Sequence, residues 1–122
     1  MQHLAQTEVE QAIMEVVDRL DELVSDMGNV GQRAALAGSE YRRKKASMTL
    51  AVIEHPPGGV KMDAKSRDAR IELACRDEQE CHALAEAEME TIRESLRAHR
   101  SRLDALRTLA ANIRVVTDPR LS

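Results

Sequence analysis

Four consecutive cations follow the only aromatic residue of the chain, and this run is the part of the sequence best suited to chemistry. Tyr41 precedes Arg42, Arg43, Lys44 and Lys45. Successive positions circle a helix, so at least two of these cations must face away from any one partner helix. Outward cations can follow a phosphate backbone, and an aromatic ring can stack on an unpaired base. The run therefore predicts binding of single-stranded nucleic acid.

Three further cations, Lys61, Lys65 and Arg67, lie in or just after a predicted turn and extend the basic region. The candidate nucleic-acid-binding residues are Tyr41, Arg42, Arg43, Lys44, Lys45, Lys61, Lys65 and Arg67. A second interpretation is open, in which the run pairs with an acidic segment across a helical hairpin, since charge runs are often solvated or paired. That segment contains Glu72, Asp77, Glu78 and Glu80. The two interpretations differ in whether the basic run points outward or toward this acidic segment.

The remaining reactive side chains form no pattern of a catalytic or metal centre. The sequence has no HExxH, Walker, GxSxG or Rossmann glycine motif. His55 and His82 are not expected to form a metal site, and His99 is interpreted as a polar residue that sets helix register. Cys75 and Cys81 are turned roughly 240° from each other on a helix and cannot join within it. We expect no catalytic residue, metal or cofactor, and predict that the protein is not an enzyme.

Charge alternates in blocks, and this indicates how the surrounding elements are arranged. Residues 1–27 carry a net charge of −6 and residues 28–53 one of +4, while residues 71–96 carry −6 and residues 97–122 carry +4. Opposite blocks face each other if the chain doubles back at residues 56–59, with residue i near residue 117 minus i. The acidic start is then expected to face Arg93, Arg97, Arg100, Arg102 and Arg107.

A helix is predicted over residues 7–53. Thr7 followed by Glu10 forms a capping box, and the apolar residues after it are mostly spaced alternately four and three apart. The series is Val9, Ile13, Val16, Leu20, Leu23, Met27, Val30, Ala34, Ala37, Tyr41 and Met48. Val17 and Val24 widen this face toward a second neighbour. Glycines weaken the middle, so two helices hinged near residues 27–31 are an open alternative.

A turn is predicted over residues 54–63 and a second helix over residues 64–116. Two prolines and two glycines at 56–59 stop the helical pattern. Asp63 can cap the second helix. Its apolar stripe contains Ile71, Ala74, Ala85, Met89, Ile92, Leu96, His99, Leu103, Leu106, Ala110 and Ile113, with a poor stretch around residues 78–82.

The predicted fold is therefore all-α: one helical domain over residues 1–122, formed by a long antiparallel helical hairpin resembling a coiled coil. Charged residues make up 32% of the chain and only aliphatic side chains are available for a core, a composition typical of long helices. Because two helices cannot enclose a core, we expect a homo-oligomer. No apolar run of about eighteen residues exists, and the start is acidic, so we expect a cytoplasmic protein without a membrane partner.

With a basic run ahead of the turn and the segments Leu103 to Arg107 and Ile113 to Arg114 after it, the chain resembles the UvsY recombination mediators of T4-type bacteriophages. The resemblance implies a ring-like oligomer that binds single-stranded DNA, loosens a single-strand-binding protein and helps to load a RecA-type recombinase. DNA binding would fall on Arg42, Arg43, Lys44 and Lys45, with Lys61, Lys65 and Arg67 as additions. A phage origin would place the protein in the host cytoplasm.

A non-enzymatic protein-interaction module is the alternative function. The acidic outer face of residues 8–26 would serve as its binding surface, and the protein would act as an adaptor, a scaffold or an inhibitor of a host protein.

Overall fold

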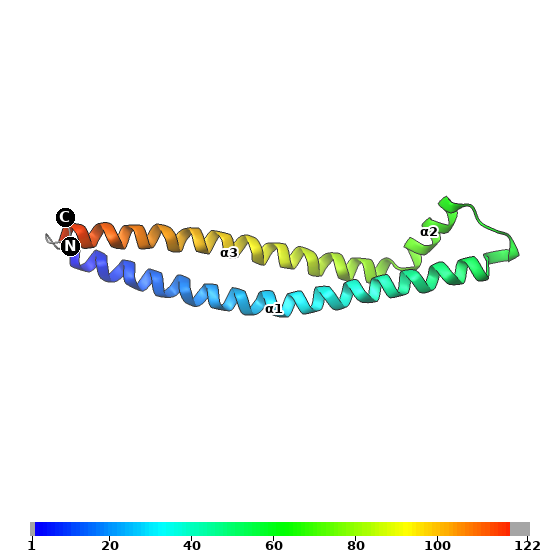
Figure 1. Ribbon diagram of the computed structural model, residues 1–122, viewed down its shortest axis with the longest axis horizontal. Helices are drawn as coiled ribbons and strands as arrows, with labels where there is room; N and C mark the ends of the chain where they lie inside the picture. The colour runs from blue at the N-terminus through cyan, green and yellow to red at the C-terminus, as the bar shows by residue number, and fades with distance from the viewer. Residues whose placement is uncertain (1, 118–122) are drawn as a thin grey trace. The chain divides into compact units, whose positions relative to one another are not determined.

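The computed structural model describes residues 2–117 and is built from helices. They are α1 (Gln2–Glu54), the short 3-10 helix η1 (Pro57–Gly59), α2 (Ala64–Ala74) and α3 (Arg76–Thr117). No strand occurs within residues 2–117, so the predicted all-α class is confirmed. The long helices α1 and α3 pack together (Figure 1). The chain divides into two compact units, one from residues up to Gly28 with those from Glu90 onward, and one from Asn29–Met89.

In the first unit, one apolar stripe of α1 packs against one stripe of α3. The buried residues are Val9, Val16 and Leu23 on α1, and Ile92, Leu96 and Leu103 on α3. All six belong to the predicted stripes. Burial of each such aliphatic side chain contributes about 1.5–3 kcal/mol, which makes this seam the main stabilising feature of the unit. His99 is half-buried in the same seam, and its Nδ1 lies 2.8 Å from the carbonyl oxygen of Ser95.

Three ion pairs in the first unit each join two residues of the same helix. Arg93 and Arg97 both contact Glu90, each at 3.4 Å, and Arg19 contacts Glu22 at 2.8 Å. Arg93 and Arg97 were expected to face the acidic start, and the ion pairs that they form are with Glu90 of their own helix.

In the second unit, the α1 seam continues through Val30 and Ala34 and ends in a cluster beside the turn. Val52, Ile71 and Cys75 are buried there, and the partly buried Tyr41, Met48 and Met62 pack around them. This cluster holds α2 against the end of α1.

Two ion pairs give the register of the second unit. Arg33 contacts Glu88 at 3.2 Å and Lys44 contacts Glu78 at 2.8 Å, so α1 and α3 are antiparallel here. The predicted register is displaced, because it would have placed Arg33 and Lys44 near residues 84 and 73. The turn explains the difference. Residues 55–63 form no α-helix, and α2 is inclined to the start of α3 (Figure 1). The chain therefore contains more residues between the end of α1 and the start of α3 than a tight hairpin would need, and this shifts the pairing.

The helix ends differ from the predicted ones in two places. Helix α1 begins before Thr7, so this residue lies inside the helix and does not cap it, and residues 27–31 belong to this one helix instead of separating two helices. The predicted second helix is divided at Cys75, whose backbone (φ −102°, ψ 12°) leaves the helical region while its side chain stays in the core. Asp77 and Glu78 then favour a new start, since acidic groups stabilise a helix N-terminus.

The turn itself is formed as its residue types require. Gly58 and Gly59 adopt positive φ values of 70° and 74°, a region that side chains with a Cβ rarely enter. The predicted cap is confirmed, because Ser66 N donates a 2.8 Å hydrogen bond to the Asp63 carboxylate. Of the helices described, none combines the length and apolar character needed to cross a bilayer.

Candidate functional site

The Tyr41 ring is already engaged within the second unit. It stacks on His82, with ring centroids 6.4 Å apart and planes inclined by 20°, and it packs against the Val52 cluster. The Lys45 ammonium lies 5.9 Å from the ring centroid, a distance at which a cation is attracted by an aromatic face. Stacking of a nucleic-acid base on Tyr41 would require the ring to leave His82.

A glycine makes room for His82. A Cβ at Gly38 would lie 3.0 Å from the His82 Nε2 atom, closer than side-chain carbons normally approach. The same Nε2 lies 3.3 Å from Glu86 Oε1, one helical turn further along α3. Sequence reasoning overlooked Glu86, although its position four residues after His82 places it on the same helix face.

Lys44 is the one cation of the run that is paired across the two helices. Its ammonium donates a 2.8 Å hydrogen bond to Glu78 Oε1. This bond raises the pKa of Lys44 and lowers the pKa of Glu78. The second carboxylate oxygen of Glu78 is buried and has no hydrogen-bond partner among the described residues. The interpretation that the basic run pairs with the acidic segment thus holds for Lys44 and Glu78.

The other cations of the run point elsewhere. Arg42, Arg43 and Lys45 are exposed, and none of the three forms an ion pair within the described part of the chain. Lys61 and Lys65 are also exposed, and Arg67 is half-buried, again without an acidic partner among residues 2–117. Six of the seven predicted cations are therefore available to an external anion.

A groove with cations at its rim lies between the end of α1 and α2. It consists of two adjoining cavities of about 210 and 280 Å³ that share Ile53 and Arg67. The first is lined by Val52, Ile53, Pro56, Lys61, Met62 and Arg67. The second adds Lys45, Thr49, Asp68, Ile71 and Glu72. We call these two cavities the basic groove.

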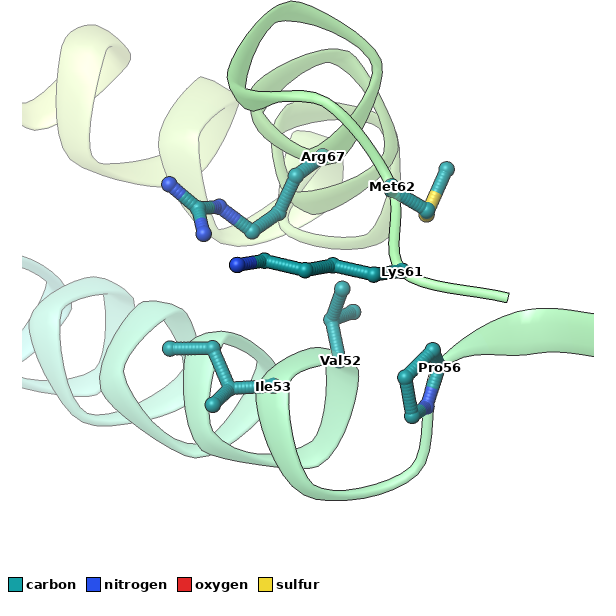
Figure 2. Close-up of a pocket in the computed structure, with 6 residues that line it drawn as sticks. All are labelled: Val52, Ile53, Pro56, Lys61, Met62 and Arg67. Atoms are coloured by element: carbon teal, nitrogen blue, oxygen red, sulfur yellow. The ribbon is translucent and has the colours of Figure 1, made fainter. Parts of the chain in front are cut away.

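The basic groove is lined by three cations from three separate elements and, in its second cavity, by the carboxylates of Asp68 and Glu72 from α2. Lys45 comes from α1, Lys61 from the extended segment before α2, and Arg67 from α2. Figure 2 shows the Lys61 and Arg67 side chains extending in the same direction, with Val52 and Ile53 on the opposite wall. In the first cavity, where the charged lining residues are Lys61 and Arg67, an aliphatic floor below these cations can bind an anionic group that carries an apolar neighbour.

The sequence predicted the cations of this site but not its apolar floor. Ile53 is the apolar residue common to both cavities, and it is 55% exposed, so it lies outside the buried seam that the heptad pattern detects. Among the predicted residues, Lys45, Lys61 and Arg67 meet at the groove, whereas Arg42, Arg43 and Lys65 lie outside it. No signal in the sequence marks Ile53 as a binding residue.

The described part of the chain holds no group of three or more His, Cys, Asp or Glu side chains that could bind a metal ion. Cys75 is buried and Cys81 is exposed, and both are free thiols.

Comparison with known proteins gives no relative from which a function could be transferred. No protein-family model, curated protein or solved structure matches this chain.

Proposed function

We propose that this chain is a non-enzymatic, homo-oligomeric helical protein that binds single-stranded DNA through the basic region around its turn. In this proposal it acts as a mediator of recombination or replication. Its protein partners would be a single-strand-binding protein and a RecA-type recombinase. The resemblance to phage recombination mediators supports the choice of these partners.

One observation carries the DNA-binding part of the proposal: the basic region is largely unpaired. Residues 41–67 contain seven Lys or Arg side chains against Glu54 and Asp63. Lys44 alone of the seven is held in an ion pair by a described residue, and Asp63 is used as a helix cap. Cations that already lack a protein partner can bind phosphates without first breaking an ion pair.

Arg42, Arg43 and Lys65 provide the most direct test, because they are exposed and do not line the basic groove. We expect their joint replacement by Ala to weaken binding of a labelled oligothymidine in a mobility shift. Each lost phosphate contact reduces the slope of log affinity against log salt by about 0.7 for single strands, so the slope should fall by about 2.

The matched control replaces Arg100, Arg102 and Arg107 by Ala. These arginines are exposed and have no acidic partner among the described residues, so the control removes the same charge from another part of the chain. Its salt slope should stay close to that of the wild type. Equal loss of slope in both variants would show that only overall charge matters and would contradict a DNA site at the turn.

The mediator role is tested separately. The protein should shorten the delay before a RecA-type recombinase assembles on DNA covered by a single-strand-binding protein, and the Arg42, Arg43 and Lys65 variant should not. Normal DNA binding with no change in this delay would remove the mediator role and keep the DNA site.

Exposed apolar residues within the acidic start favour a second candidate function, the protein-interaction module. Met14 and Val24 are 62% and 57% exposed in a segment with seven acidic residues against Arg19. In this case the chain would bind a basic partner protein through residues 8–26 and would show no affinity for oligothymidine at any salt concentration.

A further inference from the structure

Helix α1 carries a second stripe, separate from the buried seam of the first unit. Met14, Val17, Asp21 and Val24 are spaced three, four and three residues apart, which places them on one face of the helix. Val17 is half-buried, while Met14 and Val24 are more than half exposed. Three of these four residues are apolar and Asp21 is acidic. We call them the acidic stripe, because the helix around them carries most of the negative charge of residues 1–27.

The charge of this stripe selects its partner. Two acidic stripes packed against each other would bring together segments that each carry a net charge of −6 over residues 1–27. Like charges brought close together are unfavourable, so a basic surface is the better cover. Residues 41–72, which include every residue of the basic groove, carry four more basic than acidic side chains, and Asp68 and Glu72 lie in the second cavity beside the cations.

The apolar parts of the two surfaces also match. The floor of the basic groove offers Val52 and Ile53, and the acidic stripe offers Val17 and Val24 with a carboxylate at Asp21. The aliphatic side chains of the stripe can pack on the aliphatic floor, while the carboxylate of Asp21 can pair with Lys61 or Arg67.

We infer that the acidic stripe of one copy of the chain binds the basic groove of a second copy. This inference rests on the homo-oligomeric part of the proposed function and names the surfaces that would form the oligomer. The two surfaces are different, so two copies can exchange both contacts within a closed dimer, or each copy can use its stripe toward one neighbour and its groove toward another. The second arrangement generates a ring if the rotation closes and an open chain of subunits if it does not.

The experiment measures the mass of the full chain in solution by light scattering, without DNA, at about 50 mM and 500 mM salt. We expect the wild type to exceed the single-chain mass of 13.6 kDa at low salt and to dissociate at high salt, since charge pairs at an exposed rim are screened. A groove variant, Lys61→Ala with Arg67→Ala, and a stripe variant, Asp21→Ala with Val24→Ala, should each fail to form the wild-type assembly.

Mixing the two variants tests the contact between stripe and groove. The groove variant keeps an intact stripe and the stripe variant keeps an intact groove, so one working contact remains between them. The mixture should form a species of two chains and nothing larger. A charge-matched control, Arg100→Ala with Arg102→Ala, should assemble as the wild type does, and circular dichroism should show that every variant keeps its helical content.

Three results would overturn the inference. Full assembly of the groove variant would show that another surface joins the copies, and absence of a two-chain species from the mixture would exclude contact between stripe and groove. A wild type that stays a single chain at low salt would overturn both the inference and the oligomeric part of the proposed function. Because no DNA is present, failure of the DNA site would appear only in the oligothymidine measurements.

Discussion

Gly38 and His82 approach each other so closely that a Cβ at Gly38 would lie 3.0 Å from the His82 Nε2 atom. The absence of a side chain at Gly38 therefore lets α1 and α3 hold His82 against Tyr41. Gly31 lies in the same helix and has open space at the corresponding position. Two glycines of α1 with the same backbone conformation thus differ in what surrounds them.

This difference predicts different outcomes when alanine replaces each of the two glycines. Gly31→Ala should raise the free energy of unfolding by about 0.5–1 kcal/mol, because alanine is the better helix former. Gly38→Ala should lose this gain, because the new methyl group must displace the His82 ring. Thermal unfolding of both variants checks the prediction, and an equal rise in Tm would show that His82 gives way without cost.

The ion pair between Lys44 and Glu78 predicts a dependence of stability on pH. The hydrogen bond from Lys44 lowers the folded-state pKa of Glu78 below its ordinary value of 4.5. The stabilisation is therefore fully present above pH 4.5 and is lost as the pH falls through the lowered pKa. We expect Glu78→Gln to have a lower Tm than the wild type at pH 7, with a difference that shrinks in acid.

Lys44 gives the same ion pair an alkaline limit. The bond to Glu78 raises the folded-state pKa of Lys44 above 10.5, so its contribution is present below that pH and is lost as the pH rises through the raised pKa. Glu72→Gln serves as the control, because Glu72 is exposed and forms no ion pair with a described residue. A control with the same pH profile as Glu78→Gln would remove the assignment to this pair.

Asp63 predicts a result that separates hydrogen bonding from charge. Its carboxylate accepts the bond from Ser66 N, and this bond lowers the pKa of Asp63. Asp63→Ala should reduce the Tm. Asp63→Asn should reduce it much less, because an asparagine oxygen caps a helix comparably well. The Asn variant should also lose the part of the acid dependence that comes from Asp63. Equal destabilisation by Ala and Asn would show that charge, not the cap bond, matters.

The two cysteines are expected to behave differently. Cys75 is 1% exposed in the Val52 cluster, whereas Cys81 lies at the surface. Cys75→Ser should cost about 1–3 kcal/mol, because a hydroxyl replaces a thiol in an apolar cluster, and Cys81→Ser should be close to neutral. In the wild type a thiol reagent should label Cys81 at once and Cys75 only on unfolding. Rapid labelling of both thiols would mean that the cluster opens readily.

The heptad pattern predicted the buried seam because burial on a helix follows a fixed spacing, as Val9, Val16 and Leu23 illustrate. Register was harder to predict, since it depends on how many residues the turn and α2 consume, and no pattern in residues 55–63 encodes that number. The division at Cys75 was missed for a related reason. A small apolar residue fits a continuous helix as well as a corner, and the deciding contacts with Val52 and Ile71 come from the fold.

The candidate site could be predicted in its charges and not in its geometry. The sequence of residues 41–45 shows directly that cations are present. Only the pairing of the helices decides that Lys44 faces Glu78 and that Lys45 lies beside Tyr41. The groove between α1 and α2 arises where α2 departs from the line of α3, and this inclination follows from the break at Cys75.

Neighbouring cations of the basic run should therefore contribute differently to DNA binding. Lys44 is held by Glu78, while Arg43 is exposed without an ion pair to a described residue. Arg43→Ala should reduce the salt slope of oligothymidine binding by about 0.7, the value for one phosphate contact to a single strand. Lys44→Ala should leave the slope nearly unchanged and lower the Tm, because it removes a partner from Glu78, one of whose oxygens is already unpaired.

The measurement is a binding titration at several salt concentrations beside a melting curve for each variant. If the two variants lose slope equally at unchanged Tm, the ion pair does not withhold Lys44 from DNA. If neither loses slope and only the Lys44 variant melts early, the run serves the hairpin alone and the DNA-binding proposal is wrong.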